Sequence, residues 1–170
     1  MWTAEAVTDG LAAEAEPLHH HGVACMTTEQ AHDLQRRAWA LQAEGLHDDA
    51  AQAAATALAI AEASDPASAD IANLLNDLAE IEIDRQRHRV ALDLTERAHA
   101  TLLRLGSALS GETAARLQIK TFTLLGTLRR LLGEAAAESN ELVLALETAE
   151  LAFGPCHDET TAARNNLAVD

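Results

Sequence analysis

The chain repeats a pattern of small residues at a spacing of 41 to 47 positions, and this periodicity restricts the folds open to it more than any other feature. Self-similarity at a period of about 20–50 residues is typical of arrays in which each unit packs only against its neighbours. A further copy opens at residues 164–170 (RNNLAVD). The small residues at matching offsets are Ala38, Gly45, Ala50 and Ala57, then Ala79, Ala91 and Ala98, then Gly126, Gly133 and Ala145.

The composition indicates that the units are helical. Hydrophobic residues make up 48% of the chain but aromatic residues only 2%, so the apolar side chains are mostly Ala and Leu, which are strong helix formers. Gly45, Gly133 and Gly154 supply the left-handed residue that commonly ends a helix. Asp65 followed by Pro66 is typical of a helix start. The sequence predicts helices over residues 28–44, 48–63, 69–85, 88–105, 112–132, 134–152 and 159–170.

Short turns between these helices predict antiparallel pairs, with small residues where two helices cross closely. We therefore expect an all-α fold, an α-α superhelix (solenoid) of antiparallel helix pairs. Residues 1–26 are rich in Ala and Glu and are broken by Pro17, so we expect an appendage that is either disordered or one short helix. The array would cover residues 27–170, with units at about 28–66, 67–107 and 112–157 and a half unit at 158–170. The expected crossings lie at Ala38, Ala79, Gly126 and Ala168 within units, and at Ala57, Ala98 and Ala145 between units.

The charge balance argues against nucleic acid as a partner. The formal net charge is −15, whereas binding to phosphate backbones depends on Lys and Arg. No apolar run is long enough to span a membrane, and the N-terminal sequence has no basic and apolar leader, so we expect a cytoplasmic protein with no membrane partner. Cys25 and Cys156 do not suggest a disulfide framework.

Three segments carry a resemblance to a known family. Residues 75–79 (LNDLA) and 165–168 (NNLA) match the opening of a unit, and residues 153–157 (FGPCH) match its closing segment. The chain resembles the tetratricopeptide repeat, in the long variety seen in kinesin light chains and bacterial regulatory proteins. Gln86 stands where the repeat has its turn glycine, so we expect a looser or differently shaped turn there. Extra residues around 107–113 separate the second and third units.

The resemblance implies a right-handed superhelix whose concave groove, lined by the first helix of each pair, binds an extended peptide or a partner helix. Asn73, Asn76 and Asn165 would hold the peptide backbone, because an amide side chain both donates and accepts hydrogen bonds. Lys120 and Arg130 would select acidic or carboxylate-bearing ligands. The alternative is that these are solvated polar residues on an unused face. The remaining groove positions are His32, Gln35, Trp39, Gln42, Glu80, Thr123 and Thr127.

Trp39 has two interpretations. It is either a core residue with its indole N–H satisfied or an exposed anchor for a ligand.

No catalytic or cofactor motif is recognisable. His19–His21 with Cys25 have metal-ligand residue types, but consecutive residues lack the spacing of a fixed site. Cys156, His157 and Asp158 fall in the expected loop between units, where neighbouring side chains seldom face each other. We expect no enzyme activity, no metal and no cofactor.

Two functions follow. The first is a non-catalytic adaptor that binds a protein or peptide in its groove. The alternative is a structural or assembly element, either the sensor arm of a larger bacterial signalling protein or a homodimer formed through residues 158–170, where Leu167 and Val169 lack a partner helix.

Overall fold

The computed structural model describes residues 20–168, and of residues 20–27, 107 and 135–139 it describes the backbone alone. This part of the chain contains seven α-helices, one short 3-10 turn and no strand, which confirms the all-α prediction. The first helix begins at His20, eight residues before the predicted start. The helices are α1 (His20–Ala43), α2 (His47–Ser64), α3 (Ala69–Asp84), α4 (His88–Leu105), α5 (Gly111–Leu131), α6 (Ala135–Phe153) and α7 (Asp158–Leu167), and the 3-10 turn is η1 (Gly106–Ala108).

Three turns within pairs have the same backbone geometry, although one of them lacks glycine. Gly45 and Gly133 have φ angles of 78° and 80°, and Gln86 adopts 61° at the equivalent position. The amide of each of these residues donates to the carbonyl three residues earlier, and the next amide donates to the carbonyl five residues earlier, at 2.8–3.0 Å. This pair of bonds is the Schellman motif. The expectation of a different turn at Gln86 is therefore wrong; glutamine adopts the left-handed conformation at a cost of about 1 kcal/mol.

Two helix starts are fixed by side chains. Ser68 lies in an extended conformation before α3 and accepts a hydrogen bond from the amide of Asp70 at 3.1 Å. Asp65 accepts from the amide of Ala67 at 3.1 Å, so it stabilises the turn after α2 and is not the N-cap that the sequence suggested. The prolyl residue Pro66 consequently lies in the connecting loop.

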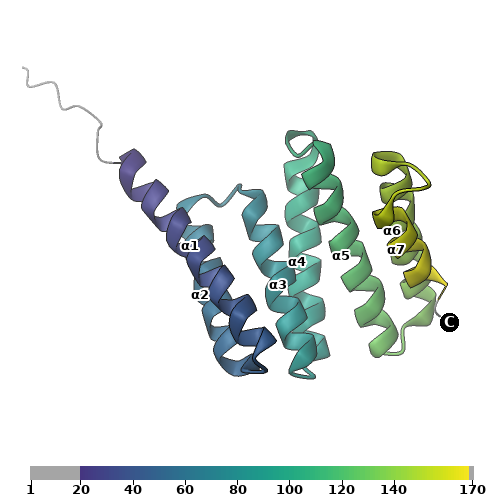
Figure 1. Cartoon of the computed structure of the whole chain (residues 1–170), viewed down its shortest axis with the longest axis horizontal. Coiled ribbons are helices and arrows are strands. Elements are labelled where there is room, and N and C mark those ends of the chain that lie inside the picture. Colours follow the sequence, from purple (N-terminus) through teal and green to yellow (C-terminus); the bar gives the residue numbers. More distant parts are fainter. Residues whose placement is uncertain (1–19, 169–170) are drawn as a thin grey trace, which may run out of the picture.

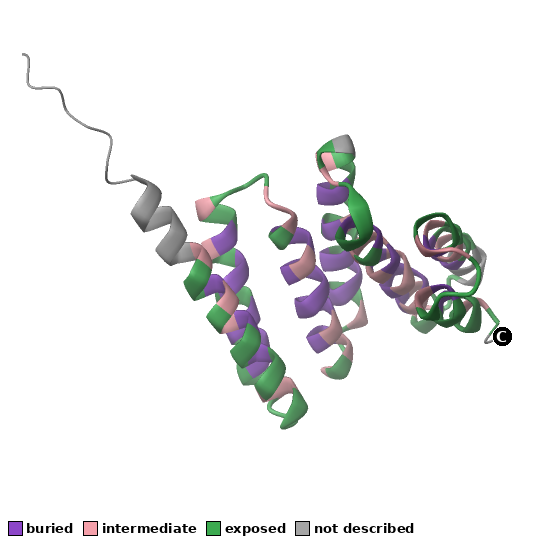
Figure 2. Cartoon of the chain, turned by 45° about the horizontal axis from the view of Figure 1, so that its top comes forward, coloured by how far each residue is buried: buried purple, intermediate pink, exposed green. Residues whose placement is uncertain are grey.

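Helices that follow one another in the chain pack against each other, and the pairs stand side by side in a row (Figure 1). The first helices of neighbouring pairs also meet, because α3 contacts α5 and α5 contacts α7. Buried positions lie on the helix sides that face other helices, whereas the outer sides are exposed (Figure 2). The first helices of the pairs, α1, α3, α5 and α7, therefore lie next to one another in this order along the row.

Small residues line the packed interior, as predicted. Ala57, Ala79 and Ala98 have no exposed surface, and Ala38 and Ala145 are almost completely buried. The main apolar cluster extends from α1 to α5 and consists largely of Ala and Leu side chains. A smaller cluster joins α5, α6 and α7 through Ile119, Ala149 and Ala163. The fourth residue expected at a crossing within a unit, Ala168, is exposed.

None of the helices in the described residues combines the length and the apolar character needed to cross a membrane.

Candidate functional site

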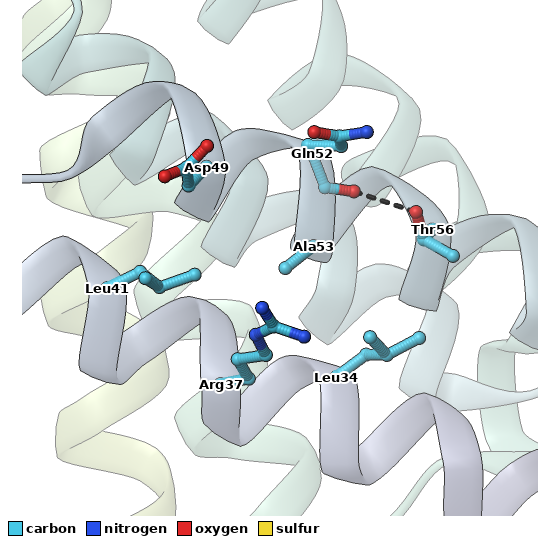
Figure 3. Close-up of a pocket in the computed structure, with 7 residues that line it drawn as sticks. All are labelled: Leu34, Arg37, Leu41, Asp49, Gln52, Ala53 and Thr56. Atoms are coloured by element: carbon cyan, nitrogen blue, oxygen red, sulfur yellow. Dashed lines mark hydrogen bonds between the residues drawn. The ribbon is translucent and has the colours of Figure 1, made fainter.

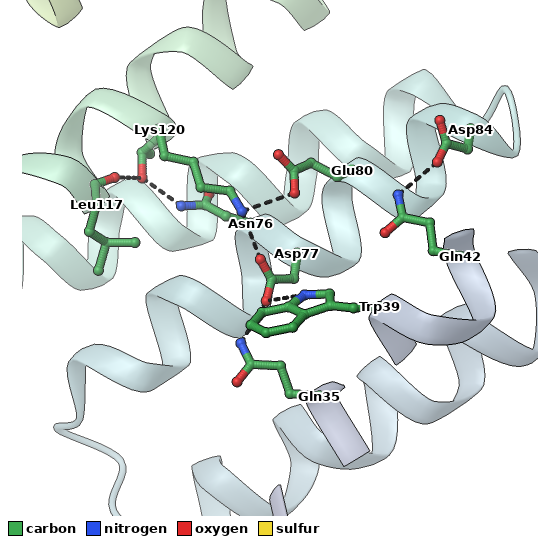
Figure 4. Close-up of polar contacts among 10 residues, drawn as sticks. Gln35, Trp39, Gln42, Asn76, Asp77, Glu80, Asp84, Leu117 and Lys120 are labelled. Atoms are coloured by element: carbon green, nitrogen blue, oxygen red, sulfur yellow. Dashed lines mark hydrogen bonds and ion pairs between the residues drawn. The ribbon is translucent and has the colours of Figure 1, made fainter. Parts of the chain in front are cut away.

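A buried carboxylate connects three of the first helices. Asp77 of α3 is 3% exposed and accepts hydrogen bonds from Gln35 Nε2 at 2.6 Å and from Trp39 Nε1 at 3.1 Å, both on α1. Its other oxygen accepts from Lys120 Nζ of α5 at 2.7 Å. Figure 4 shows these side chains converging between the helices, and we call them, together with Gln42, Glu80 and Asp84, the Asp77 network. A carboxylate with three donors is well compensated for its burial.

Lys120 is neutralised by carboxylates of its own chain. Its ammonium lies 2.7 Å from Asp77 and 2.9 Å from Glu80. Burial alone would lower the pKa of Lys120, but the charges and hydrogen bonds of Asp77 and Glu80 raise that pKa above its usual value of 10.5. Lys120 is thus charged at neutral pH, and its ammonium is already paired with two carboxylates of the chain.

Asn76 lies in the interior. It has no exposed surface, and its Nδ2 donates to Thr121 Oγ1 at 2.8 Å, while that hydroxyl donates to the carbonyl of Leu117 at 2.8 Å. The Oδ1 atom of Asn76 is buried without a hydrogen-bond partner. A side chain with no exposed surface cannot touch a ligand, so the expectation that Asn76 holds a peptide backbone is wrong. Asn76 instead joins α3 to α5.

Trp39 combines features of both interpretations given above. Its indole N–H is satisfied by Asp77, yet the residue is 47% exposed and is not part of the core. The core interpretation is therefore right about the satisfied N–H and wrong about burial. One helical turn further along, Gln42 donates to Asp84 Oδ2 at 2.7 Å, which adds a third hydrogen bond between α1 and α3 to those of Gln35 and Trp39 (Figure 4). These bonds fix the position of the indole ring at the surface.

The other predicted residues are more scattered. Asn73 is partly exposed and lines a cavity of about 270 Å³ between α3, α5 and the extra residues after η1, where Leu109 and Leu117 supply apolar walls. Thr123 is partly buried on α5, and Arg130 and Asn165 are exposed on α5 and α7. None of these residues is among those joined in Figure 4.

The α3 side of the network is acidic. Asp70, Asp77, Glu80 and Asp84 recur at intervals of three, four or seven residues, which places them on one side of the helix. Lys120 neutralises only part of this charge. His32 lies 3.6 Å from Asp70, and His47 lies 3.8 Å from Asp84. The surface around Trp39 therefore combines an exposed aromatic ring with carboxylates.

Asp77 is not among the predicted site residues, although the repeat period contains the information that identifies it. Gln35 and Asp77 are 42 residues apart, Lys120 and Asp77 are 43 apart, and Gln42 and Asp84 are 42 apart. These separations equal about one unit, so the bonded residues occupy similar places in neighbouring units. Complementary polar residues one period apart would have identified the network.

A second cavity lies between α1 and α2 (Figure 3). Its α1 residues, Leu34, Arg37 and Leu41, lie on another side of the helix from Trp39 by their spacing in the sequence. Its volume is about 360 Å³ and its walls include Leu34, Leu41 and Ala53. The hydroxyl of Thr56 donates to the carbonyl of Gln52 at 2.8 Å and is already satisfied. Arg37, Asp49, Gln52 and Thr56 complete the wall, so most of the lining is polar, unlike the mainly apolar lining of typical small-molecule sites.

The remaining sequence candidates show no catalytic or metal geometry. His157 Nδ1 accepts a hydrogen bond from the amide of Glu159 at 3.2 Å and caps α7, while its ring stacks on Phe153 at 4.8 Å between centroids. Cys156 is an exposed free thiol. No group of three or more metal-ligand residues occurs in the described part of the chain. His19 lies outside the described residues, as do the side chains of His20, His21 and Cys25.

In comparisons with known proteins, no family model matches the sequence, and no curated protein matches it.

Proposed function

We propose that this chain is a non-catalytic interaction module of the tetratricopeptide type, which binds a protein or peptide on the face formed by its first helices. The repeated small residues and the three equivalent turns at Gly45, Gln86 and Gly133 support units of one kind. The row of antiparallel pairs is consistent with a superhelix whose concave side carries the Asp77 network. The proposal involves no cofactor and no catalytic step, and it places the protein in the cytoplasm.

The observation that carries the proposal is the state of Trp39. A half-exposed indole has a large apolar surface to bury, and Trp is enriched among the residues that dominate binding energy at interfaces. Its N–H is already bonded to Asp77, so the ring is fixed before a ligand arrives. A fixed side chain loses less conformational entropy on binding than a mobile one.

The proposal can be tested by affinity capture from a native cytoplasmic extract with quantitative mass spectrometry. The variant is Trp39→Ala, and the matched control is Leu103→Ser, which alters an exposed apolar residue on α4, a second helix. We expect a partner that wild type and the control capture and that the Trp39 variant loses. Equal capture by all three proteins would contradict the proposed face.

A second candidate, self-assembly, is favoured by exposed leucines near the C-terminal pair. Leu151 of α6 is 91% exposed and Leu144, two turns earlier, is 41% exposed. An apolar stripe of this kind can pack against another helix, and the alternative of a homodimer through residues 158–170 involves the same end of the row. Light scattering over a concentration series tests it: a dimer that Leu151→Ser dissociates would support assembly, and a monomer at every concentration would exclude it.

A further inference from the structure

We infer that the segment bound at Trp39 is basic: an extended peptide that places an arginine or lysine side chain on the indole ring, beside the carboxylates of Glu80 and Asp84. This inference rests on the proposed function and adds the chemistry of the partner.

The indole ring is presented for such a contact. Its N–H points to Asp77, so the polar edge is used inside the molecule while nearly half of the residue stays exposed. Cations bind over the face of an aromatic ring, and tryptophan is the most favourable ring for this. Guanidinium groups also stack on aromatic rings through their flat surface.

The neighbouring carboxylates have capacity for further donors. The side chains of Glu80 and Asp84 are 42% and 41% exposed, and each has one partner with hydrogen-bond geometry, Lys120 for Glu80 and Gln42 for Asp84. A carboxylate accepts about four hydrogen bonds, so both can accept more. Both residues lie within about two helical turns of Asp77, to which Trp39 is bonded.

The net charge of the surface around Trp39 favours a positively charged ligand. The first-helix face around Trp39 has the carboxylates of Asp70, Asp77, Glu80 and Asp84, against the ammonium of Lys120. The imidazoles of His32 and His47 lie beside Asp70 and Asp84, and the guanidinium of Arg36 is paired with Asp33. Asp77 and Glu80 together compensate the charge of Lys120. The surface therefore keeps a net negative charge, which would repel an acidic ligand. The chain's net charge of −15 adds an attraction for basic segments at longer range.

The experiment uses three synthetic peptides of equal length in which alanine alternates with arginine, glutamine or glutamate. Binding is followed by the fluorescence of Trp39 in the full chain carrying Trp2→Phe, since the sequence has two tryptophans. We expect the arginine peptide to change the fluorescence and to bind about tenfold or more tightly than the glutamine peptide, with an affinity that falls as salt rises. The glutamate peptide should not bind.

Variants then locate the site with labelled arginine peptide and fluorescence polarisation. Trp39→Leu should weaken binding about 30-fold, as expected for an interface hot spot. Asp84→Asn should weaken it about threefold to tenfold, whereas Asp93→Asn, the same charge change at an exposed position of α4, should have an effect of about twofold or less. Thermal melts of the variants confirm that they are folded.

Three results would overturn the inference. These are no binding of the arginine peptide, preference for the glutamate peptide, or equal loss of affinity in the Asp84 and Asp93 variants, which would indicate attraction to the overall charge only. The partner capture described above tests the proposed function independently, so a captured partner that binds through Trp39 without preferring basic segments would refute this inference alone.

Discussion

The two ends of the helix row are held together differently. From α1 to α5 one apolar cluster runs through the pairs, and Asp77 bonds to residues of α1 and α5 from its buried position on α3. Between α5 and α7, the described side chains form a smaller cluster, in which Leu146 and Phe153 pack against the buried residues Ile119, Ala149 and Ala163, and an ion pair between Arg116 and Glu159 supports it at the surface. Because units contact mainly their neighbours, stability need not be uniform along the row. The comparison indicates a rigid block that contains Trp39 and a weaker C-terminal end.

The largest effect is expected from a cavity in the rigid block. Leu75 of α3 is 1% exposed, and Leu75→Ala should lower the free energy of unfolding by about 2–5 kcal/mol. The matched change at the other end, Leu142→Ala in α6, should act mainly by lowering hydrogen-exchange protection of α6 and α7. Urea denaturation and hydrogen exchange measure the two effects. If Leu142→Ala reduced protection equally in α1–α4, the row would be one cooperative unit and the comparison would fail.

The next effect concerns the cation beside Asp77. Lys120→Met leaves a buried carboxylate with only the neutral donors of Gln35 and Trp39, and we expect a loss of about 2–3 kcal/mol in urea denaturation at neutral pH. A double variant with Asp77→Asn should recover part of this loss, because no charge is then left unpaired. A neutral result for Lys120→Met would mean that solvent replaces the ammonium without cost.

The same lysine gives a pH dependence. Because Asp77 and Glu80 raise the pKa of Lys120 in the folded chain above its usual value of 10.5, its stabilising effect is fully present below pH 10.5 and is lost as pH rises through the folded pKa. The stability difference between wild type and Lys120→Met should therefore narrow above that pH. A constant difference through the alkaline range would show that the ion pairs do not contribute.

A smaller effect is expected from the buried amide between α3 and α5. Asn76→Ala removes a hydrogen bond to Thr121 and should cost about 1–2 kcal/mol, because the position has no exposed surface. A double-mutant cycle with Thr121→Val isolates the bond between the two side chains. An unchanged melt for Asn76→Ala would place this residue at the surface and would restore its sequence-based interpretation.

The smallest effect is expected at the C-terminal end. The Arg116 side chain is about half exposed, pairs with Glu159 and lies over the Phe153 ring at 5.0 Å from the guanidinium carbon to the ring centroid. Arg116→Ala should cost about 0.5–1 kcal/mol, and hydrogen exchange should increase in α7 but not in α3. A larger cost, or an effect that reaches α3, would indicate that this end is as tightly coupled as the block.

The sequence predicted the helices and most of their ends because local chemistry determines them. Repeated glycines, alanines at crossings and the absence of strand-forming runs were sufficient for this. Gln86 was misjudged because the surrounding turn can impose a left-handed conformation on a residue that does not prefer it. The predicted N-cap at Asp65 was wrong because Ser68, three residues later, also has a capping side chain, and only the backbone conformation shows that Ser68 occupies the N-cap.

The site was predicted less well, for a different reason. The role of Asn76 depends on Thr121 and that of Lys120 depends on Asp77, and both partners are about one unit away in the sequence. In addition, polar residues in adjacent turns of one helix can face either the protein interior or the solvent, and the sequence alone does not distinguish the two. Gln35 and Trp39 were selected by the resemblance, but their common acceptor was not. A free Lys120 would favour an acidic ligand, whereas Lys120 paired with Asp77 and Glu80 leaves a surface that favours a basic one. The sequence does not show this pairing.

Asp77 also has a mechanical consequence. A carboxylate is a flat, rigid group, and here one oxygen is bonded to residues of α1 while the other is bonded to α5. If α1 tilts and the carboxylate turns to follow it, the second oxygen must move against Lys120. Bending between the first pair (α1 and α2) and the second pair (α3 and α4) is thereby transmitted to the interface between the second pair and the third (α5 and α6). We expect these two interfaces to bend together. A force applied to Trp39 on α1 would then displace α5 through Asp77 on α3.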